Sequence, residues 1–373
     1  MDTFSNSTGD IMGNVEYFVF FGTAFVFCYL LTSALMPIAR KLNLVDLPTE
    51  RKQHLVPTPL VGGVAIYTTV CLSAILFTSP MVNFSLLAWF GIVLILGVID
   101  DLNAVRYQIR LFCQACIVAG IFLTVDLAIY DIGALFSTSP VNFTGATALL
   151  FTAVAVVGTA NAVNMSDGID GLAALLIVTS LFAIFFYAIS ATAGSHHISP
   201  KGIVVFAGAL SAFLLFNCRF LGRIQAAAFL GDAGSTTLGF VLAYLLIDYS
   251  QGELSIVSPV LAGWIMGLPL LDGSAVMLHR LIGGKSPCHP GREHLHHLLL
   301  DSGISVNKTV LLMLAIHITL IATGIAAFEL HGRSADAALF WGFVALVICR
   351  VYIAKTYIAT RTTIDHKSIP NDF

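Results

Sequence analysis

The chain has 373 residues, of which 57% are hydrophobic and only 10% are charged. Soluble domains carry roughly 25% charged residues, so a soluble fold of this length could not bury so much apolar surface. The net charge is -3 and no run of basic residues is present, so composition gives no sign of nucleic-acid binding. The sequence therefore predicts an all-α, polytopic membrane protein with lipid as the solvent for much of its surface.

Apolar runs follow one another along the chain, and a membrane helix needs about 20 such residues. The first run has neither a basic segment before it nor a small-residue cleavage site, so we expect a retained span rather than a signal peptide. The sequence shows no internal repeat, and residues 1–373 are expected to form one membrane domain. About eleven spans are predicted, near residues 17–38, 60–79, 86–99, 111–130, 145–163, 172–193, 202–217, 233–247, 256–279, 309–328 and 336–354.

Basic residues fall almost entirely in alternate segments between these spans. One set of segments holds 16 of the 18 lysines and arginines, and the other holds only Lys201 and Arg333. Positive charge accumulates in cytoplasmic loops, so the first set is predicted to be cytoplasmic. The N-terminus is then periplasmic and the C-terminus cytoplasmic.

Five polar segments stand out, and all are predicted to lie on the cytoplasmic side. The first runs from Lys52 to Gly63, where Lys52 and His54 could meet a phosphate or a base; a flexible loop with ordinary positive charge is the alternative. The second is the pair Asp100-Asp101 at the end of the third span. A carboxylate near lipid costs free energy, and at a helix C-terminus it also opposes the helix dipole. We therefore favour a functional pair, of a kind that suits Mg²⁺, over the alternative of a solvated helix end.

The third and fourth segments are rich in acids, amides and glycines. Asn161, Asn164 and Asp167 are spaced by three, which places them on roughly one face of a helical turn, and Asp170 follows; no nearby lysine or arginine neutralises them. A cation or the donor groups of a nucleoside would suit this segment, and a polar turn is the alternative. In Phe229–Ser235, Asp232 between glycines resembles a metal ligand, unless it is simply a helix N-cap.

The fifth segment is the histidine-rich stretch from Gly283 to His297. Its members are Lys285, Arg292, His294, His296 and His297, and Arg280 precedes them. Zinc is disfavoured because the three histidines cannot all point one way on a helix and no cysteine pair accompanies them. Imidazoles with arginine and lysine make a good cradle for a diphosphate. Together, the five segments indicate Mg²⁺-assisted phosphoryl transfer at the membrane surface, with a lipid as one substrate.

These motifs resemble those of the polyprenyl-phosphate N-acetylhexosamine-1-phosphate transferases. The stretches NAVNMSDGIDGL, FLGDAGST and GKSPCHPGREHLHH occur in the family's order after the acidic pair, and the resemblance extends from about Lys41 to Ser302. It implies transfer from a UDP-N-acetylhexosamine to a polyprenyl phosphate, with UMP released. It also implies a requirement for Mg²⁺, with Mn²⁺ as an alternative.

The HLHH sequence is similar to that of the branch that uses UDP-N-acetylglucosamine and undecaprenyl phosphate. That branch initiates O antigen, common antigen or related cell-surface polysaccharides at the bacterial inner membrane. Leu295 interrupts the three adjacent histidines of the branch that uses UDP-MurNAc-pentapeptide, which therefore ranks second. UDP-GalNAc is a further alternative donor, and an ion-coupled transporter is the alternative from another class. The resemblance is also compatible with a homodimer.

Residue roles follow from the resemblance only. It implies catalytic roles for Asp100 and Asp101, and metal ligation by Asp232 and Asn164 with support from Asp167. Nucleotide contacts are implied for Asp170, Phe229 and Lys52, although the adjacent stretch from Gln225 to Ala228 lacks basic residues common in relatives. Contacts with the diphosphate and sugar are implied for Arg280, Arg292, His294, His296 and His297. Direct attack of the lipid phosphate is favoured, and a two-step route through an aspartyl-phosphate stays open.

Overall fold

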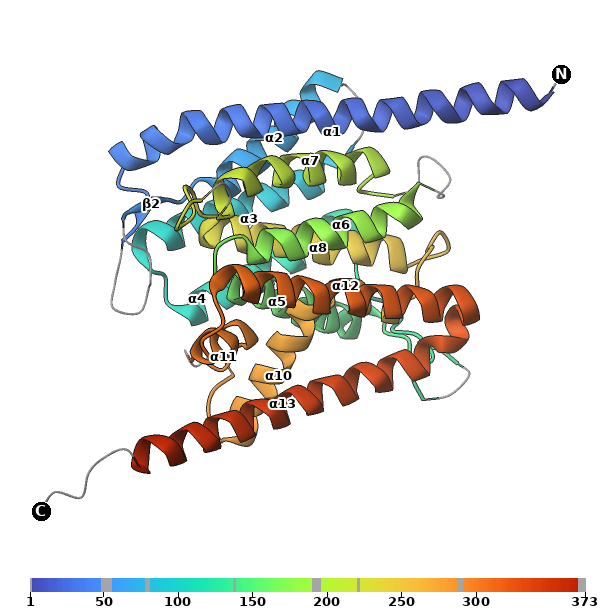
Figure 1. Cartoon of the computed structure of the whole chain (residues 1–373). Coiled ribbons are helices and arrows are strands. Elements are labelled where there is room, and N and C mark those ends of the chain that lie inside the picture. Colours follow the sequence, from blue (N-terminus) through green and yellow to red (C-terminus); the bar gives the residue numbers. More distant parts are fainter. Residues whose placement is uncertain are drawn as a thin grey trace, which may run out of the picture.

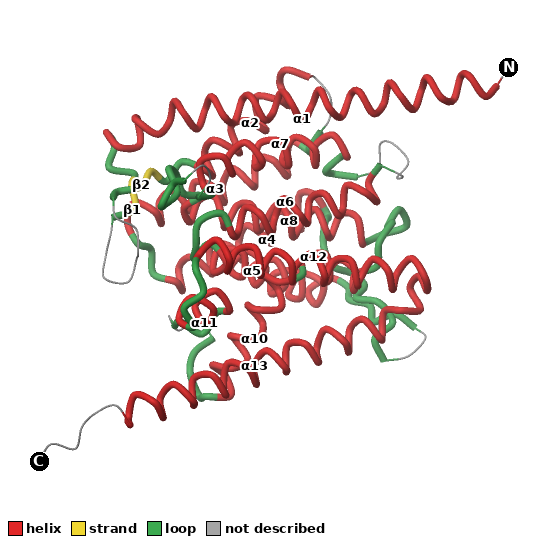
Figure 2. Tube along the Cα trace, viewed as in Figure 1, coloured by secondary structure: helices red, strands yellow, loops and turns green. Residues whose placement is uncertain are grey.

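The structure is a computed structural model that describes residues 2–47, 56–77, 81–136, 139–189, 196–219, 222–287 and 291–367, with side chains described between residues 15 and 357. Helices make up most of this part of the chain, and the strands are one short antiparallel pair (Figures 1 and 2). The helices are α1 Asp2–Lys41, α2 Gly62–Phe77, α3 Phe84–Asn103, α4 Tyr107–Val125, α5 Gly145–Ser166, α6 Leu172–Ala188, α7 Pro200–Asn217, α8 Gly231–Ser250, α9 Pro259–Met266, α10 Leu268–Ile282, α11 Leu295–Asp301, α12 Val306–His331 and α13 Asp336–Lys367; the strands are β1 Val45–Asp46 and β2 Thr58–Pro59.

The prediction of a polytopic helical membrane protein is confirmed. Each predicted span coincides with helical structure, and six segments among the described residues are long and apolar enough to cross a membrane. The predicted ninth span is two helices, α9 and α10, which meet at an angle of 87° and together make a seventh candidate. The total of eleven spans and the orientation of the termini remain predictions.

Short polar caps explain where several of these helices begin. The Asn83 side chain accepts hydrogen bonds from the backbone N–H groups of Ser85 and Leu86 at the start of α3. Ser199 and Ser258 cap α7 and α9 in the same way, and each is followed by a proline, whose fixed φ suits the first helical position. Such caps satisfy N–H groups that lipid could not.

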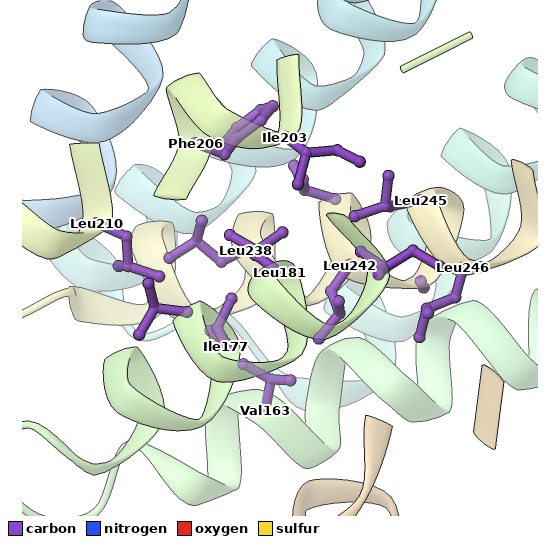
Figure 3. Packing of buried hydrophobic residues seen from close by; sticks show 14 of the residues in the cluster. Val163, Ile177, Leu181, Ile203, Phe206, Leu210, Leu238, Leu242, Leu245 and Leu246 are labelled. Atoms are coloured by element: carbon purple, nitrogen blue, oxygen red, sulfur yellow. The ribbon is translucent and has the colours of Figure 1, made fainter. Parts of the chain in front are cut away.

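Helix α8 forms the centre of the bundle. It packs against α2, α3, α5 and α6, and nearly all of its residues are buried. Figure 3 shows its leucines Leu238, Leu242 and Leu246 among apolar side chains from α5, α6 and α7. Because α8 is enclosed on several sides, its N-terminus is held rigidly relative to the neighbouring helices.

Most of the predicted site elements gather at one end of the bundle. Figure 1 shows β2, α11 and the C-terminal part of α13 at this end. Leu60, just after β2, pairs with Phe229, which lies just before α8. Phe229 donates its N–H to the Pro59 carbonyl and accepts from the Gly62 N–H. The segment before α8 is therefore fixed to the start of α2.

Candidate active site

The adjacent carboxylates of α3 make different contacts. Asp100 is buried and accepts a hydrogen bond of 2.8 Å from the Val105 N–H, which closes the end of α3. Its other oxygen lies 2.7 Å from Nη1 of Arg110, on α4. Asp100 is therefore ion-paired within the protein rather than solvated at a helix end.

Asp101 binds the N-terminus of α8 instead. Its two oxygens accept the backbone N–H groups of Asp232 at 2.8 Å and Ala233 at 3.1 Å. One turn earlier, Gly97 lets the helices meet, because a Cβ there would lie 2.3 Å from the Ala233 Cα. Gly231 opens α8 with a φ of +73°, a backbone conformation that favours glycine. A carboxylate at a helix N-terminus is also stabilised by the helix dipole.

Asp232 is the point at which α3, α4, α5 and α8 meet. Nδ2 of Asn164, at the end of α5, donates to Oδ1 of Asp232 at 2.6 Å and to Oγ of Ser235 at 2.9 Å. Nη1 of Arg110 lies 3.9 Å from the other Asp232 oxygen. Three residues that the sequence suggested as functional, Asp101, Asn164 and Asp232, thus lie together.

Negative charge accumulates around Asp167, just after α5. Burial raises the pKa of the Asp167 carboxyl well above its usual range, and the nearby Asp232, Asp101 and Asp170 raise it further. An excess of carboxylate oxygen beside an amide suits a hard cation such as Mg²⁺. Within the described residues, no three histidine, cysteine or acidic side chains already form a complete metal site. The donors present fit an ion that takes its remaining ligands from substrate phosphates.

The acidic loop after α5 has a basic partner, contrary to the sequence prediction. Nε of Arg219 lies 2.8 Å from the Asp170 carboxylate, which also accepts the Ala226 N–H at 2.8 Å. The Asn217 side chain ties the same two segments together, because it accepts from the Gly171 N–H and donates to the Ala228 carbonyl. Arg219 was missed because 49 residues separate it from Asp170 in the sequence.

The histidine-rich segment packs over this loop. The His296 ring lies directly against Gly168, where a Cβ would be 2.4 Å from Nε2. Burial lowers the pKa of His296 to about 3, and burial together with Arg292 lowers the pKa of His297 to about 4. Both rings are therefore neutral at pH 7, and their ring nitrogens in the buried interior have no hydrogen-bond partner among the described residues.

Two arginines in and just before this segment bind nearby acids. Arg280, at the end of α10, donates to Glu293 at 2.9 Å and to the Pro287 carbonyl. Arg292 donates to Asp301 at 3.0 Å, with about half of its side chain exposed. Their roles toward a substrate, like those of Asp170 and Phe229, remain predictions. Lys52 and His54 lie outside the described residues.

Comparison with known proteins gives a consistent result. Residues 83–250 match a family model described as glycosyl transferase family 4. The chain is 32% identical to the undecaprenyl-phosphate alpha-N-acetylglucosaminyl 1-phosphate transferase of Yersinia pestis over 333 residues, which are 87% of this chain and 88% of that protein. It is 32% identical to the protein of the same name from Escherichia coli strain K12, over 82% of this chain and 83% of the relative. A probable undecaprenyl-phosphate N-acetylglucosaminyl 1-phosphate transferase of Bacillus subtilis is 29% identical over 88% of both chains.

Proposed function

The chain belongs to glycosyl transferase family 4, and we propose that it transfers N-acetylglucosamine 1-phosphate from UDP-N-acetylglucosamine to undecaprenyl phosphate. The products would be undecaprenyl-diphospho-N-acetylglucosamine and UMP. The observation that carries this proposal is the contact between His296 and Gly168, which brings the histidine-rich segment onto the acidic loop. The acidic half of the site comprises Asp101, Asn164, Asp167 and Asp232 and would hold a metal. The histidine-rich half comprises Arg280, Arg292, His294, His296 and His297 and would donate hydrogen bonds to phosphates. Phosphoryl transfer between two anions requires both.

The acidic half would hold Mg²⁺, with Mn²⁺ as a substitute. Asp232 and Asn164 would be its ligands and Asp167 would support them, because these side chains supply hard oxygens in a region of excess negative charge. The ion would neutralise charge on the diphosphate as the bond between the phosphates breaks. Asp101 would hold Asp232 in place through the backbone of α8.

Direct attack by the lipid phosphate on the β-phosphorus of the UDP-sugar requires little from a base. A phosphate monoester with a second pKa near 6 is mostly dianionic at neutral pH and already nucleophilic. Both Asp101 oxygens accept backbone N–H groups and Asp100 is paired with Arg110, so neither carboxylate is an unbound nucleophile in this structure. This supports the direct route over an aspartyl-phosphate. Trapping a phospho-sugar on either residue, with the acceptor withheld, would contradict it.

We place the enzyme in the bacterial cytoplasmic membrane with the site facing the cytoplasm, at the first membrane step of a cell-surface polysaccharide such as O antigen. Three arguments support this placement: the segregation of basic residues in the sequence, the gathering of site elements at one end of the bundle, and the bacterial relatives. A soluble nucleotide sugar could meet a membrane-anchored phosphate there. Eleven spans and a homodimer belong to the same proposal.

The test is release of UMP by the purified full-length protein in detergent micelles or proteoliposomes. UMP should form from UDP-N-acetylglucosamine only when Mg²⁺ and undecaprenyl phosphate are both present. Replacing the donor with UDP-GalNAc or UDP-MurNAc-pentapeptide tests the two alternative substrates. If no UDP-sugar in the panel releases UMP, the enzyme proposal fails and ion transport in proteoliposomes becomes the next measurement.

A further inference from the structure

A buried ionic network joins three segments that are far apart in the sequence. Asp272 of α10 accepts hydrogen bonds from Nδ1 of His294 at 2.9 Å and from Nε of Arg350 at 2.9 Å. It also accepts the Leu295 N–H at 3.1 Å, where α11 begins. Asp272, His294 and Arg350 are only 4%, 7% and 5% exposed. Burying charged groups this deeply costs free energy unless they are paired. The pairing of these three side chains therefore indicates a specific role.

The network is balanced in charge when His294 is neutral. Arg350, on α13, also donates to the Glu293 carbonyl at 2.7 Å, and Arg280 donates to the Glu293 carboxylate at 2.9 Å. Two carboxylates thus face two guanidinium groups. Protonation of His294 adds one positive charge, which a bound anion would compensate.

The orientation of His294 determines what its second nitrogen can do. Because Nδ1 faces Asp272, Nε2 points away from the carboxylate, and no described residue forms a hydrogen bond with it. Phosphate oxygens only accept hydrogen bonds, so Nε2 can bind a diphosphate only as a donor. A ring that donates from both nitrogens is an imidazolium, and the Asp272 carboxylate stabilises that form.

The network lies beside the acidic half of the site. Gly273, next to Asp272, lets α10 approach α5 so closely that a Cβ there would be 2.9 Å from the Ala162 Cβ. The His294 ring is nearly parallel to the His296 ring, with their centroids 5.8 Å apart. His296 in turn lies on Gly168, next to Asp167. A diphosphate bound between the acidic loop and the histidine-rich segment would therefore lie close to His294.

We propose that Asp272 and Arg350 are positioning residues that hold His294 with Nδ1–H on the carboxylate, so that Nε2–H donates to the diphosphate of the nucleotide sugar. Binding of the donor substrate is then coupled to uptake of one proton by His294. This inference rests on the proposed function, and it assigns roles to Asp272 and Arg350, which the sequence motifs do not include.

The titratable groups nearest to His294 are not expected to give the same pH response. The neighbouring rings on α11, His296 and His297, have pKa values lowered to about 3 and about 4, so they stay neutral across the neutral range. The charged side chains of the network and the adjoining loop are Asp272, Glu293, Arg280, Arg292 and Arg350, and none of these types ordinarily titrates near neutral pH. The pKa of Asp167 in the acidic half is also raised, so the difference between the wild type and the His294 variants, and not the wild-type profile alone, reports on His294.

The decisive variants are His294→Asn and His294→Gln. An asparagine amide can replace Nδ1–H and keep the bond with Asp272, but it has nothing at the place of Nε2; glutamine reaches that place instead. KM for UDP-N-acetylglucosamine is measured by UMP release from about pH 6 to about pH 8.5, with undecaprenyl phosphate saturating. His197→Asn is the matched control, because Nδ1 of His197 bonds Asp248 at 3.0 Å in a pair outside the proposed site.

We expect His294→Asn to raise KM about tenfold to a hundredfold at the lower pH, the value of one charge-assisted hydrogen bond, with a smaller change in kcat. The wild-type KM should rise with pH more steeply than that of the variant. Asp272→Asn should raise KM as well and Asp272→Glu should restore part of the loss, with melting temperature recording stability separately. If His294→Asn keeps the wild-type KM and pH profile while the wild type releases UMP, the inference fails and the proposed function stands. If the wild type itself is inactive, the proposed function has failed.

Discussion

Replacing Asp101 with asparagine separates a structural role of this residue from a chemical one. The carboxylate accepts the N–H groups of Asp232 and Ala233 with its two oxygens. Asparagine offers one oxygen and one NH₂ group, so one N–H at the start of α8 would face a donor. The backbone that carries Asp232, the proposed metal ligand, would then be held by one hydrogen bond instead of two.

The size of the effect follows from these contacts. A hydrogen bond to a charged group contributes about 1.5–3 kcal/mol, and the interaction of the charge with the helix dipole adds about 0.3–1 kcal/mol. If this lost free energy displaces Asp232 from its metal-binding position, the affinity for the metal falls by about tenfold or more, because about 1.4 kcal/mol corresponds to a factor of ten. We therefore expect Asp101→Asn to raise the Mg²⁺ concentration needed for half-maximal activity by at least about tenfold, with much of the activity recovered at high Mg²⁺.

The measurement is a Mg²⁺ titration of UMP release together with the melting temperature of each variant. Asp126→Asn is the control, because Asp126 also lies at a helix end but bonds only the Tyr130 hydroxyl among the described residues. An unchanged Mg²⁺ requirement with a hundredfold fall in kcat would refute the positioning argument. Asp101 would then act on the reacting groups directly.

Three further predictions test other parts of the structure. Gly97→Ala should cost about 1–3 kcal/mol of stability and most of the activity, because its Cβ would lie 2.3 Å from the Ala233 Cα, whereas Gly158→Ala, with nothing within 4 Å, should change neither. His317→Leu should destabilise the protein, because it leaves the Leu268 N–H without an acceptor at the bend between α9 and α10. The melting temperature should fall by about 2–4 °C for each kcal/mol of stability lost, and an unchanged melting temperature would contradict this. Lowering the pH from about 6.5 toward 3 should destabilise the protein through His296 by at most about 1.4 kcal/mol per pH unit, because the folded-state pKa of about 3 lies below the unfolded value and folding favours the neutral ring. His296→Gln should reduce the slope of the free energy of unfolding against pH. An equal slope in the variant and the wild type would refute the assignment.

Helix positions were largely predictable because apolar runs of span length have few alternatives in lipid. The predicted spans 145–163 and 202–217 correspond to Gly145–Ser166 and Pro200–Asn217. The break in the ninth span was not predicted. Gly267 adopts a φ of +55° there, and the freed Leu268 N–H is accepted by His317 from α12. Hydropathy alone could not reveal a bend that depends on a side chain 49 residues away.

The acidic residues of the site were predictable, but their partners were not. Asp100, Asn164 and Asp232 stand out because polar groups at the ends of apolar runs are rare. Arg110 and Arg219 look like ordinary cytoplasmic charges, and only the folded structure shows that each faces a carboxylate. Long-range pairing leaves no local pattern in a single sequence.

The two halves of the site differ in how they are built, which suggests how specificity is divided between them. The acidic half lies within residues 83–250, the part that matches the family model, and is anchored by backbone bonds at the rigid N-terminus of α8. The histidine-rich half lies beyond that part, on a loop that is fixed by Asp272, Arg280 and Arg350. A loop without a core of its own can change its side chains without disturbing the metal ligands. We therefore expect the acidic half to serve the phosphoryl transfer common to the family and the histidine-rich half to select the sugar.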